Sequence, residues 1–257
     1  MTRFTSDRLF GGATAQAWLT RLASSTALVL AAPAVAQTCQ ARSADRQVLL
    51  VELYTSEGCN SCPPADRWLS TLKGRPQVLA AAFHVDYWDR LGWTDRFGDA
   101  RHTERQAEAA RQGGARFSYT PQVLINGRDW RGWPTLPIVE APAAVHLALV
   151  RGEGQRVDVT VTPRSGSPAR LGLWWAVLED GHVSRVLAGE NLGVTLQHDH
   201  VVRRYGRLPA WAASTGMAVA QQLSAAQNGE GGRKVRLLVV VTDAVTGAPL
   251  QAAQLVC

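Results

Sequence analysis

The chain has 257 residues, which is long for one minimal domain and short for three. Hydrophobic residues make up 46% and charged residues 19%, an ordinary balance for a soluble globular protein. The net charge of +6 comes from 27 Lys and Arg against 21 Asp and Glu. Because the basic residues are scattered and form no dense tract, this composition argues against a nucleic-acid partner.

Residues 1–36 are predicted to be an export signal that is later removed. Arg3 and Arg8 precede an apolar run at 27–32, and Ala-Val-Ala at 34–36 supplies a small-x-small cleavage site. The apolar run is too short to span a bilayer, so no stable membrane anchor is expected. The alternative is an unprocessed, disordered N-terminus. We expect a bacterial protein that is periplasmic or secreted.

Four cysteines in an exported chain indicate an oxidising compartment. Cys59 and Cys62 have C-x-x-C spacing, whereas Cys39 and Cys257 lie at opposite ends of the mature chain. Three pairings are formally open. We predict a structural disulfide between Cys39 and Cys257, because it leaves the close pair free for chemistry.

A strand is predicted over 48–54 and a helix over 65–72. The first segment is an almost continuous apolar run, and the second has apolar residues at i, i+3, i+4 and i+7. The two prolines after Cys62 are tolerated only in the first turn of a helix, so the helix begins beside the cysteines. Cys59 and Cys62 therefore lie on a strand-to-helix turn, where the helix dipole favours a thiolate.

This turn indicates a site of thiol–disulfide exchange. Exchange needs a nucleophile and a second thiol that releases the mixed disulfide. Cys59 is predicted to be the attacking thiolate, because we expect it nearest the helix start, and Cys62 the resolving thiol. An inert disulfide and half of a metal site are the two alternatives. No cofactor is expected.

A second buried strand is predicted over 78–85, followed by an aromatic, acidic loop over 86–95 and a polar helix over 98–112. A helix between two buried strands is typical of a parallel βαβ unit. A short apolar strand at 122–125 follows Thr120-Pro121 and ends in an Asn-Gly turn. The proline before this strand is a candidate for a cis peptide bond, and a trans, structural proline is the alternative.

The pattern changes near residue 150. Polar and apolar residues alternate over 156–162, and further strands are predicted over 171–178 and 235–241, separated by turns rich in Gly and Pro. This half is predicted to be antiparallel β, a small sandwich. Prolines between 134 and 142 mark the linker.

The order of elements over residues 46–130 resembles the thioredoxin fold. The predicted fold class is therefore α/β: a thioredoxin-like domain over 37–140, followed by a smaller β-rich, sandwich-like domain over 150–257. The chain also resembles a family of exported bacterial thioredoxin-like proteins known as domain of unknown function 1223. The segments that carry this resemblance are residues 52–66, 83–89, 92–93, 105–106, 119–123, 189–193 and 201–203.

The thioredoxin resemblance implies further site residues. Glu52, on the strand that leads to the cysteines, is similar to the buried carboxylate that shuttles the proton of the resolving cysteine. Pairing of Glu52 with a nearby arginine is the alternative. Thr120 and Pro121 resemble the cis-proline loop whose backbone pairs with an extended substrate segment.

His84 and Asp86 end the second strand one residue apart, so we expect them on the same side. They are predicted to tune the thiolate or to relay protons. Alternatively, Cys59, Cys62 and His84 bind copper or zinc. A structural pair of His84 with Asp86 is the third interpretation.

Aromatic residues follow in the next loop. Tyr87, Trp88 and Trp93 are predicted to form an apolar wall for a substrate peptide, with core packing of the loop as the alternative. His198 and His200 alternate in a predicted strand and therefore share a face. A solvent-facing strand explains them better than a metal site.

The predicted activity is thiol–disulfide exchange on thiols and disulfides of proteins or peptides, together with an unidentified redox partner. The chain is thus a candidate thiol–disulfide oxidoreductase. Two other classes stay open: a copper- or zinc-binding protein, and a non-catalytic binding module in which the disulfide only staples a loop.

Overall fold

A computed structural model of the chain describes residues 39–154, 156–215, 217–221 and 229–257. The predicted export signal at residues 1–36 lies outside them. None of the described helices is long and apolar enough to cross a membrane. The elements are β1 (Gln40–Arg42), β2 (Leu49–Thr55), α1 (Pro63–Ser70), β3 (Val78–His84), η1 (Asp89–Leu91), α2 (Ala100–Gln112), β4 (Gln122–Ile125), β5 (Arg128–Asp129), β6 (Val145–Arg151), β7 (Val157–Pro163), β8 (Arg170–Glu179), β9 (His182–Arg185), β10 (Thr195–His198), β11 (Val201–Ala212), η2 (Ala213–Thr215), β12 (Met217–Gln221), η3 (Glu230–Gly232), β13 (Val235–Asp243) and β14 (Pro249–Val256).

Most individual elements lie where the sequence pattern predicts them. The predicted strands at 48–54, 78–85 and 122–125 are β2, β3 and β4, and the predicted helix at 98–112 is α2. The helix expected over 65–72 is α1, which begins two residues earlier and ends at Ser70. Local periodicity and the position of the prolines were sufficient for these assignments.

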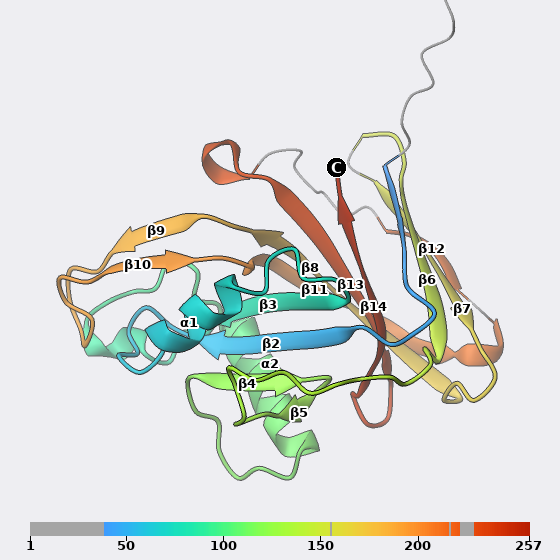
Figure 1. Cartoon of the computed structure of the whole chain (residues 1–257), viewed down its shortest axis with the longest axis horizontal. Coiled ribbons are helices and arrows are strands. Elements are labelled where there is room, and N and C mark those ends of the chain that lie inside the picture. The colour runs from blue at the N-terminus through green and yellow to red at the C-terminus, as the bar shows by residue number, and fades with distance from the viewer. Residues whose placement is uncertain (1–38, 155, 216, 222–228) are drawn as a thin grey trace, which may run out of the picture. The chain divides into compact units, whose positions relative to one another are not determined.

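Strands from both halves of the chain form one mixed sheet of eight strands (Figure 1), in the order β14-β13-β8-β11-β3-β2-β4-β5. β2 and β3 run parallel, with Leu49 opposite Val78, and β4 runs antiparallel to β2. The halves meet where β11 pairs with β3. There Val201 is opposite Ala82, and the Ala82 amide donates a hydrogen bond to the His200 carbonyl at 2.8 Å.

This sheet shows that the predicted fold class is wrong. A thioredoxin-like α/β domain followed by its own sandwich would have two separate sheets, whereas here the strands of both halves share one, and the fold is mostly β. The physical reason is the edge of β3, whose backbone groups need partners and receive them from β11. Periodicity reports which residues are buried but not which strand covers an edge. The domain limits near residues 140 and 150 stay a prediction.

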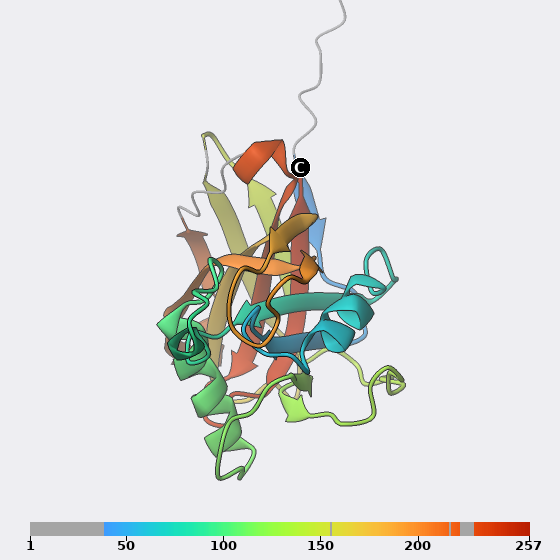
Figure 2. The ribbon, with the colours of Figure 1, turned by 90° about the vertical axis from the view of Figure 1, so that its left-hand side faces the viewer.

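Each face of the large sheet is covered by another layer. Trp68 and Leu69 of α1 pack against β2 and β3, and α2 lies on the opposite face, as Figures 1 and 2 show. The four-stranded sheet β1-β6-β7-β12 packs on the half of the large sheet that β8, β13 and β14 form. Apolar side chains of β6 and β7, such as Leu147 and Val159, meet Leu237 there. The cysteine turn thus follows a strand that has packed side chains on both faces.

A disulfide joins Cys39 to Cys257, with their Cα atoms 5.7 Å apart. It ties the residue before β1 to the residue after β14 across 218 positions of sequence. β1 and β14 are strands of the two packed sheets at the sandwich. This disulfide is therefore a long-range cross-link of the sandwich layers and uses neither cysteine of the C-x-x-C pair.

Candidate functional site

Cys59 and Cys62 form a disulfide on the turn between β2 and α1, with Cα atoms 5.4 Å apart. The Cys62 amide donates a hydrogen bond to the Cys59 carbonyl at 3.2 Å. Cys62 is the N-cap residue of α1, and Pro63 and Pro64 are its first two helical residues. Their missing N–H groups cost nothing in the first turn. The helix therefore starts beside the cysteines, as the prolines predict, but the cysteine nearest to its start is Cys62, not Cys59.

The loop between β9 and β10 covers the cysteine turn. Asn191 donates hydrogen bonds from Nδ2 to the carbonyls of Glu57 at 2.8 Å and Cys59 at 3.0 Å. Glu190 accepts one from the Asn60 amide at 3.2 Å. As a result, Cys59 and its partner cysteine are both 0% exposed, so a substrate reaches the disulfide only when this cover opens.

Replacement of Asn191 by alanine is expected to speed reduction of the Cys59–Cys62 disulfide by a small thiol. The side chain makes two hydrogen bonds to the turn, each worth about 1 kcal/mol. Their loss, about 2 kcal/mol in total, raises the open fraction roughly thirtyfold, since about 1.4 kcal/mol is a factor of ten. Asn126→Gly is the control: it removes a hydrogen bond from the remote β4–β5 turn, where φ is +47°. Equal rates in both variants would show that Asn191 does not hold the cover.

The aromatic loop after β3 covers the turn from another direction. Trp88 packs so closely that a Cβ added to Gly58 would lie 3.0 Å from the Trp88 Cβ. Trp88 Nε1 donates to Thr120 Oγ1 at 2.8 Å, and Trp93 Nε1 donates to Glu57 Oε2 at 2.8 Å. Both tryptophans are half-buried. They are therefore part of the wall around the disulfide and keep partly exposed ring surface.

Tyr87 and the Thr120–Pro121 peptide are the other predicted substrate contacts. Tyr87 donates its hydroxyl to Gln106 of α2 at 3.3 Å, so its polar end is directed to the helix. The Thr120–Pro121 peptide bond is cis. It directly precedes β4, whose first residue, Gln122, is opposite Tyr54 near the end of β2. The cis peptide thus lies at the same end of the sheet as the cysteine turn.

Glu52 is not brought to the cysteines. Along β2, Val51 and Leu53 pack toward α1 and Tyr54 packs on the other face, so alternation places Glu52 on the face opposite α1. Its carboxylate Oε2 accepts hydrogen bonds from Arg105 Nη2 at 2.6 Å and Nε at 2.9 Å. This is the arginine pairing that the sequence left as an alternative.

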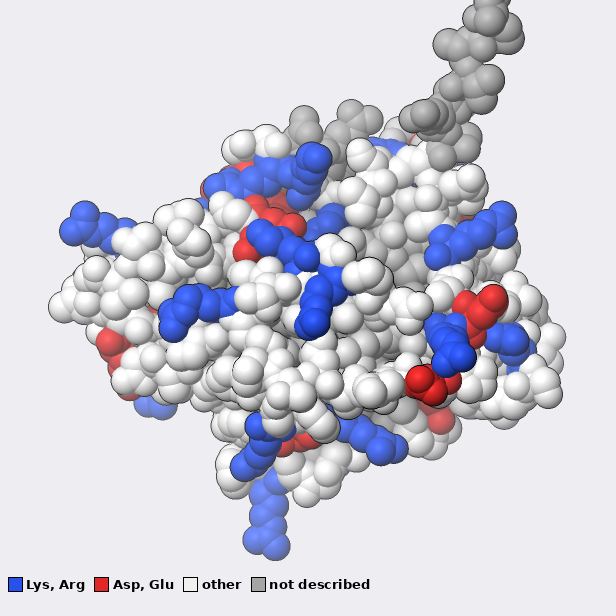
Figure 3. Space-filling model, in the orientation of Figure 1, with Lys and Arg blue, Asp and Glu red and all other residues white. Residues whose placement is uncertain are grey.

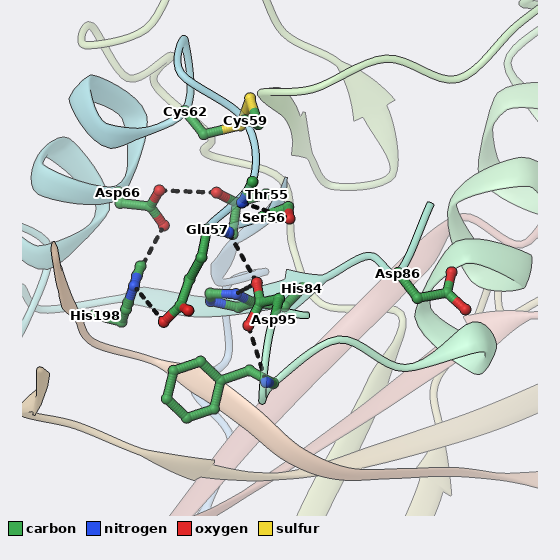
Figure 4. Close-up of polar contacts among 12 residues, drawn as sticks. Thr55, Ser56, Glu57, Cys59, Cys62, Asp66, His84, Asp86, Asp95 and His198 are labelled. Carbon is green, nitrogen blue, oxygen red and sulfur yellow. Dashed lines mark hydrogen bonds and ion pairs between the residues drawn. A yellow bond between two sulfur atoms is a disulfide. The ribbon is translucent and has the colours of Figure 1, made fainter. Parts of the chain in front are cut away.

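A buried polar cluster lies beneath the disulfide, between α1, the end of β3 and the end of β10 (Figure 4). Its members are Thr55, Glu57, Asp66, His84, Asp95 and His198. All six are buried, although together they contain three carboxylates and two imidazoles. Because buried charge is costly unless it is paired, we expect these side chains to pair with one another.

His198 lies between two carboxylates of the buried polar cluster. Its Nδ1 is 3.7 Å from Asp66 Oδ1, and its Nε2 is 3.4 Å from Glu57 Oε1. Thr55 holds the other oxygen of Asp66 by donating a hydrogen bond at 2.8 Å. Burial works to lower the pKa of His198, but Asp66 and Glu57 outweigh it and raise the pKa to about 9. His198 therefore carries a proton at neutral pH in this structure.

His84 is held by Asp95. His84 Nδ1 lies 2.7 Å from Asp95 Oδ2, and Asp95 also accepts the amides of Glu57 at 2.8 Å and Phe97 at 2.9 Å. Burial works to raise the pKa of Asp95, but His84 and the two amides lower it to about 2. His84 therefore donates from Nδ1 and directs Nε2 toward the cluster.

Two predicted arrangements of polar residues do not form. β3 ends at His84, so its alternation does not extend to Asp86, which points away in Figure 4 and accepts a hydrogen bond from Thr103 at 2.6 Å. β10 ends at His198, and His200 lies beyond it with φ of +58°. His198 and His200 are 2% and 3% exposed, so the expected solvent-facing strand is wrong.

One combination of these residues has metal-ligating geometry. A ligand atom from each of Asp66, His84 and His198 lies within 4.8 Å of the others. The alternative set of Cys59, Cys62 and His84 is not a group of this kind among the described residues. The two sulfur atoms are bonded to each other, and the His84 ring packs edge-to-face with His198, with ring centroids 4.9 Å apart.

Sequence reasoning does not single out Glu57, Asp66 or Asp95. For the first two a signal existed, because they lie two residues before Cys59 and four residues after Cys62, and any turn that closes this pair brings them near it. Asp95 gave no signal. It lies in a loop whose course depends on hydrogen bonds to the backbone of Glu57 and Phe97.

Comparisons with known proteins identify a family. The sequence model of the family described as protein of unknown function (DUF1223) matches residues 50–242. The fold resembles that of protein AGR_C_4864 from Agrobacterium tumefaciens, with 24% identity and a TM-score of 0.58, over 83% of this chain and 96% of that chain. It also resembles HBP35 of Porphyromonas gingivalis, with 14% identity and a TM-score of 0.51, over 82% of this chain and 76% of that chain. No curated protein matches the sequence.

Proposed function

We propose thiol–disulfide exchange by the Cys59–Cys62 pair as the activity of this chain, which belongs to the DUF1223 family. The substrates would be thiols and disulfides of proteins or peptides. The observation that carries the proposal is a disulfide between residues three positions apart, on a turn that leads directly into a helix. A thiolate beside a helix start is stabilised by the amides and the dipole of the helix.

The size of the two disulfide loops supports a chemical role for the short one. Loop-entropy arguments assign about 2 kcal/mol of stabilisation to a ring of this size and about 5 kcal/mol to one that spans the chain. The long-range cross-link is already made by Cys39 and Cys257. As a staple, the Cys59–Cys62 bond would add less than half as much as the long-range cross-link, which favours exchange chemistry as the reason for its place on the turn.

The reaction needs no group beyond the two cysteines and the substrate. In the reducing direction, the Cys59 thiolate attacks a substrate disulfide, forms a mixed disulfide and releases one substrate sulfur as thiolate. The Cys62 thiolate then attacks the Cys59 sulfur, which re-forms the Cys59–Cys62 bond and releases the second substrate thiolate. Two electrons pass to the substrate, and the released thiolates take protons from water. The reverse sequence oxidises the substrate.

Cys59 is the better candidate for the attacking sulfur. Its Sγ lies 3.4 Å from Oγ of the exposed Ser61, a hydroxyl that can donate a hydrogen bond to a thiolate. Cys62 instead caps α1, and its carbonyl accepts the amides of Ala65 and Asp66. An attack by Cys59 therefore leaves the start of the helix in place.

The surroundings fit an extended peptide substrate. The cis Thr120–Pro121 bond and the half-buried rings of Trp88 and Trp93 lie around the turn and offer backbone groups and apolar surface. The surface over α1 and the β9–β10 hairpin is mainly uncharged in Figure 3. The proposal therefore includes substrates chosen by shape and apolar contact, in a periplasmic or secreted protein with a separate redox partner.

The test is a redox titration of the mature protein. It is equilibrated in glutathione buffers, free thiols are alkylated, and the modified cysteines are located by mass spectrometry. We expect a reversible transition confined to Cys59 and Cys62, with Cys39–Cys257 oxidised throughout as the internal control. A Cys59–Cys62 pair that stays oxidised in strongly reducing buffer would be a structural staple, and the proposal would fail.

A further inference from the structure

The buried polar cluster contains ligand-type atoms that make no hydrogen bond. His84 Nε2, Glu57 Oε1 and both ring nitrogens of His198 are buried and make no hydrogen bond within the described residues. The residues are 0%, 0% and 2% exposed, respectively. An unpaired buried polar atom costs on the order of 1–3 kcal/mol, and here several converge on the same space. His84 Nε2 thus has no partner, and the carboxylates of Glu57 and Asp66 reach His198 only at ion-pair distances of 3.4 and 3.7 Å.

We propose that Asp66, His84 and His198 bind a divalent first-row transition metal ion, with Zn²⁺ as the best match. Each contributes one ligand atom, and the three atoms lie within 4.8 Å of one another. Two imidazole nitrogens and a carboxylate oxygen form a donor set that zinc prefers in proteins. This site lies below the disulfide, uses neither cysteine and does not depend on the proposed exchange activity.

Protons alone leave this cluster incompletely satisfied. Asp95 holds His84 through Nδ1, and Nε2 on the other side of the ring is buried without a hydrogen-bond partner. His198 lies between Asp66 and Glu57, and its contacts with them leave His84 Nε2 without a hydrogen-bond partner. A metal ion bound to His84 and His198 would provide a partner for both rings.

The charge of the cluster also favours a cation. Glu57, Asp66 and Asp95 form ion pairs only with histidine among the described residues, and no Lys or Arg contacts them. Even a protonated His198 leaves an excess of carboxylates in a fully buried space. A divalent ion provides the missing positive charge at the point where the free ligand atoms meet.

The outer contacts of these side chains are those of a supported metal site. Asp95 accepts the Nδ1 proton of His84, which fixes the ring and leaves Nε2 free to ligate. Thr55 donates to one oxygen of Asp66 and leaves the other oriented toward His198. These partners orient the ligands before any ion arrives, which lowers the cost of binding.

A second group with similar spacing lacks this deficit of positive charge. Glu179, His182 and Glu230 also have ligand atoms within 4.8 Å. However, Arg203 lies 3.6 Å from Glu179 and 3.5 Å from Glu230, and Arg96 lies 3.2 Å from Glu230. The arginines already neutralise this group, so it is the internal comparison for the proposed site.

The test is metal binding by the full chain with both disulfides intact, so that no cysteine can ligate. The protein is stripped with a chelator, and Zn²⁺ binding is followed by calorimetry. We expect one Zn²⁺ per chain, no binding in His198→Gln or Asp66→Asn, and affinity about 10–100-fold lower in Asp95→Asn, which loses only an outer contact. His146→Gln, at a half-exposed histidine, is the matched control and should bind like the unmodified chain.

A second readout keeps the proposal testable even where a variant fails to fold. Co²⁺ bound to the unmodified chain should show ligand-field bands of nitrogen and oxygen ligands, without a sulfur-to-cobalt charge-transfer band. The proposal is overturned if the stripped chain binds neither ion. It is also overturned if binding survives in a folded His198→Gln protein, or is lost in His182→Gln while His198→Gln retains it.

Discussion

Cys59→Ser is expected to abolish thiol–disulfide exchange, whereas Cys62→Ser is expected to trap mixed disulfides with substrate. The first change removes the attacking sulfur, so no mixed disulfide forms. The second leaves Cys59 able to attack but removes the thiol that would release the product. The measurement is the rate at which a disulfide-containing peptide is reduced, together with mass spectrometry of the trapped adduct.

The matched control is the double variant Cys39→Ser/Cys257→Ser, which removes the other disulfide of the structure. Its stability should fall, but its exchange rate per folded molecule should be unchanged. If Cys59→Ser kept full activity, Cys59 would not be the nucleophile. Adducts that accumulate on Cys62 in Cys59→Ser, and not on Cys59 in Cys62→Ser, would reverse the roles of the two cysteines.

The elements of this fold were more predictable than their assembly. The apolar run of β2, the prolines after Cys62 and the Asn-Gly turn after β4 are local signals, and each led to an element in the right place. The pairing of β11 with β3 joins residues 82 and 201, and no local pattern encodes such a contact. That pairing turns the two expected domains into one eight-stranded sheet, which is why the predicted fold class failed.

In the site, too, residues close in sequence were predictable, whereas those brought in from the second half of the chain were not. The spacing of Cys59 and Cys62 located the turn, because their disulfide needs only one turn of backbone. Asn191 and His198 come from the second half of the chain, and their contacts depend on where the β9–β10 hairpin packs. The thioredoxin resemblance implied a role for Glu52 at the cysteines, whereas strand alternation directs its side chain to the face opposite α1.

Glu52→Gln is expected to lower the free energy of unfolding by about 3–5 kcal/mol, the usual cost of leaving one member of a buried ion pair without its partner. Glu52 is 1% exposed, and Arg105 donates to it from Nη2 and Nε. The guanidinium also lies 4.2 Å from the Trp174 ring centroid, so turning to solvent would break this contact. Burial works to lower the pKa of Arg105, but Glu52 outweighs it and raises the pKa, so the charge persists. Urea unfolding measures the loss.

Glu108→Gln is the matched control for this change. Glu108 pairs with Arg207 on the exposed side of α2, where both side chains are more than a third exposed, so its loss should cost about 0–1 kcal/mol. The exchange rate per folded molecule separates a structural role of Glu52 from a chemical one. We expect Glu52→Gln to leave that rate unchanged, because its carboxylate faces away from α1 and is held by Arg105. A rate about 10²–10⁴-fold lower, with stability retained, would instead identify Glu52 as the general base that the thioredoxin resemblance implied.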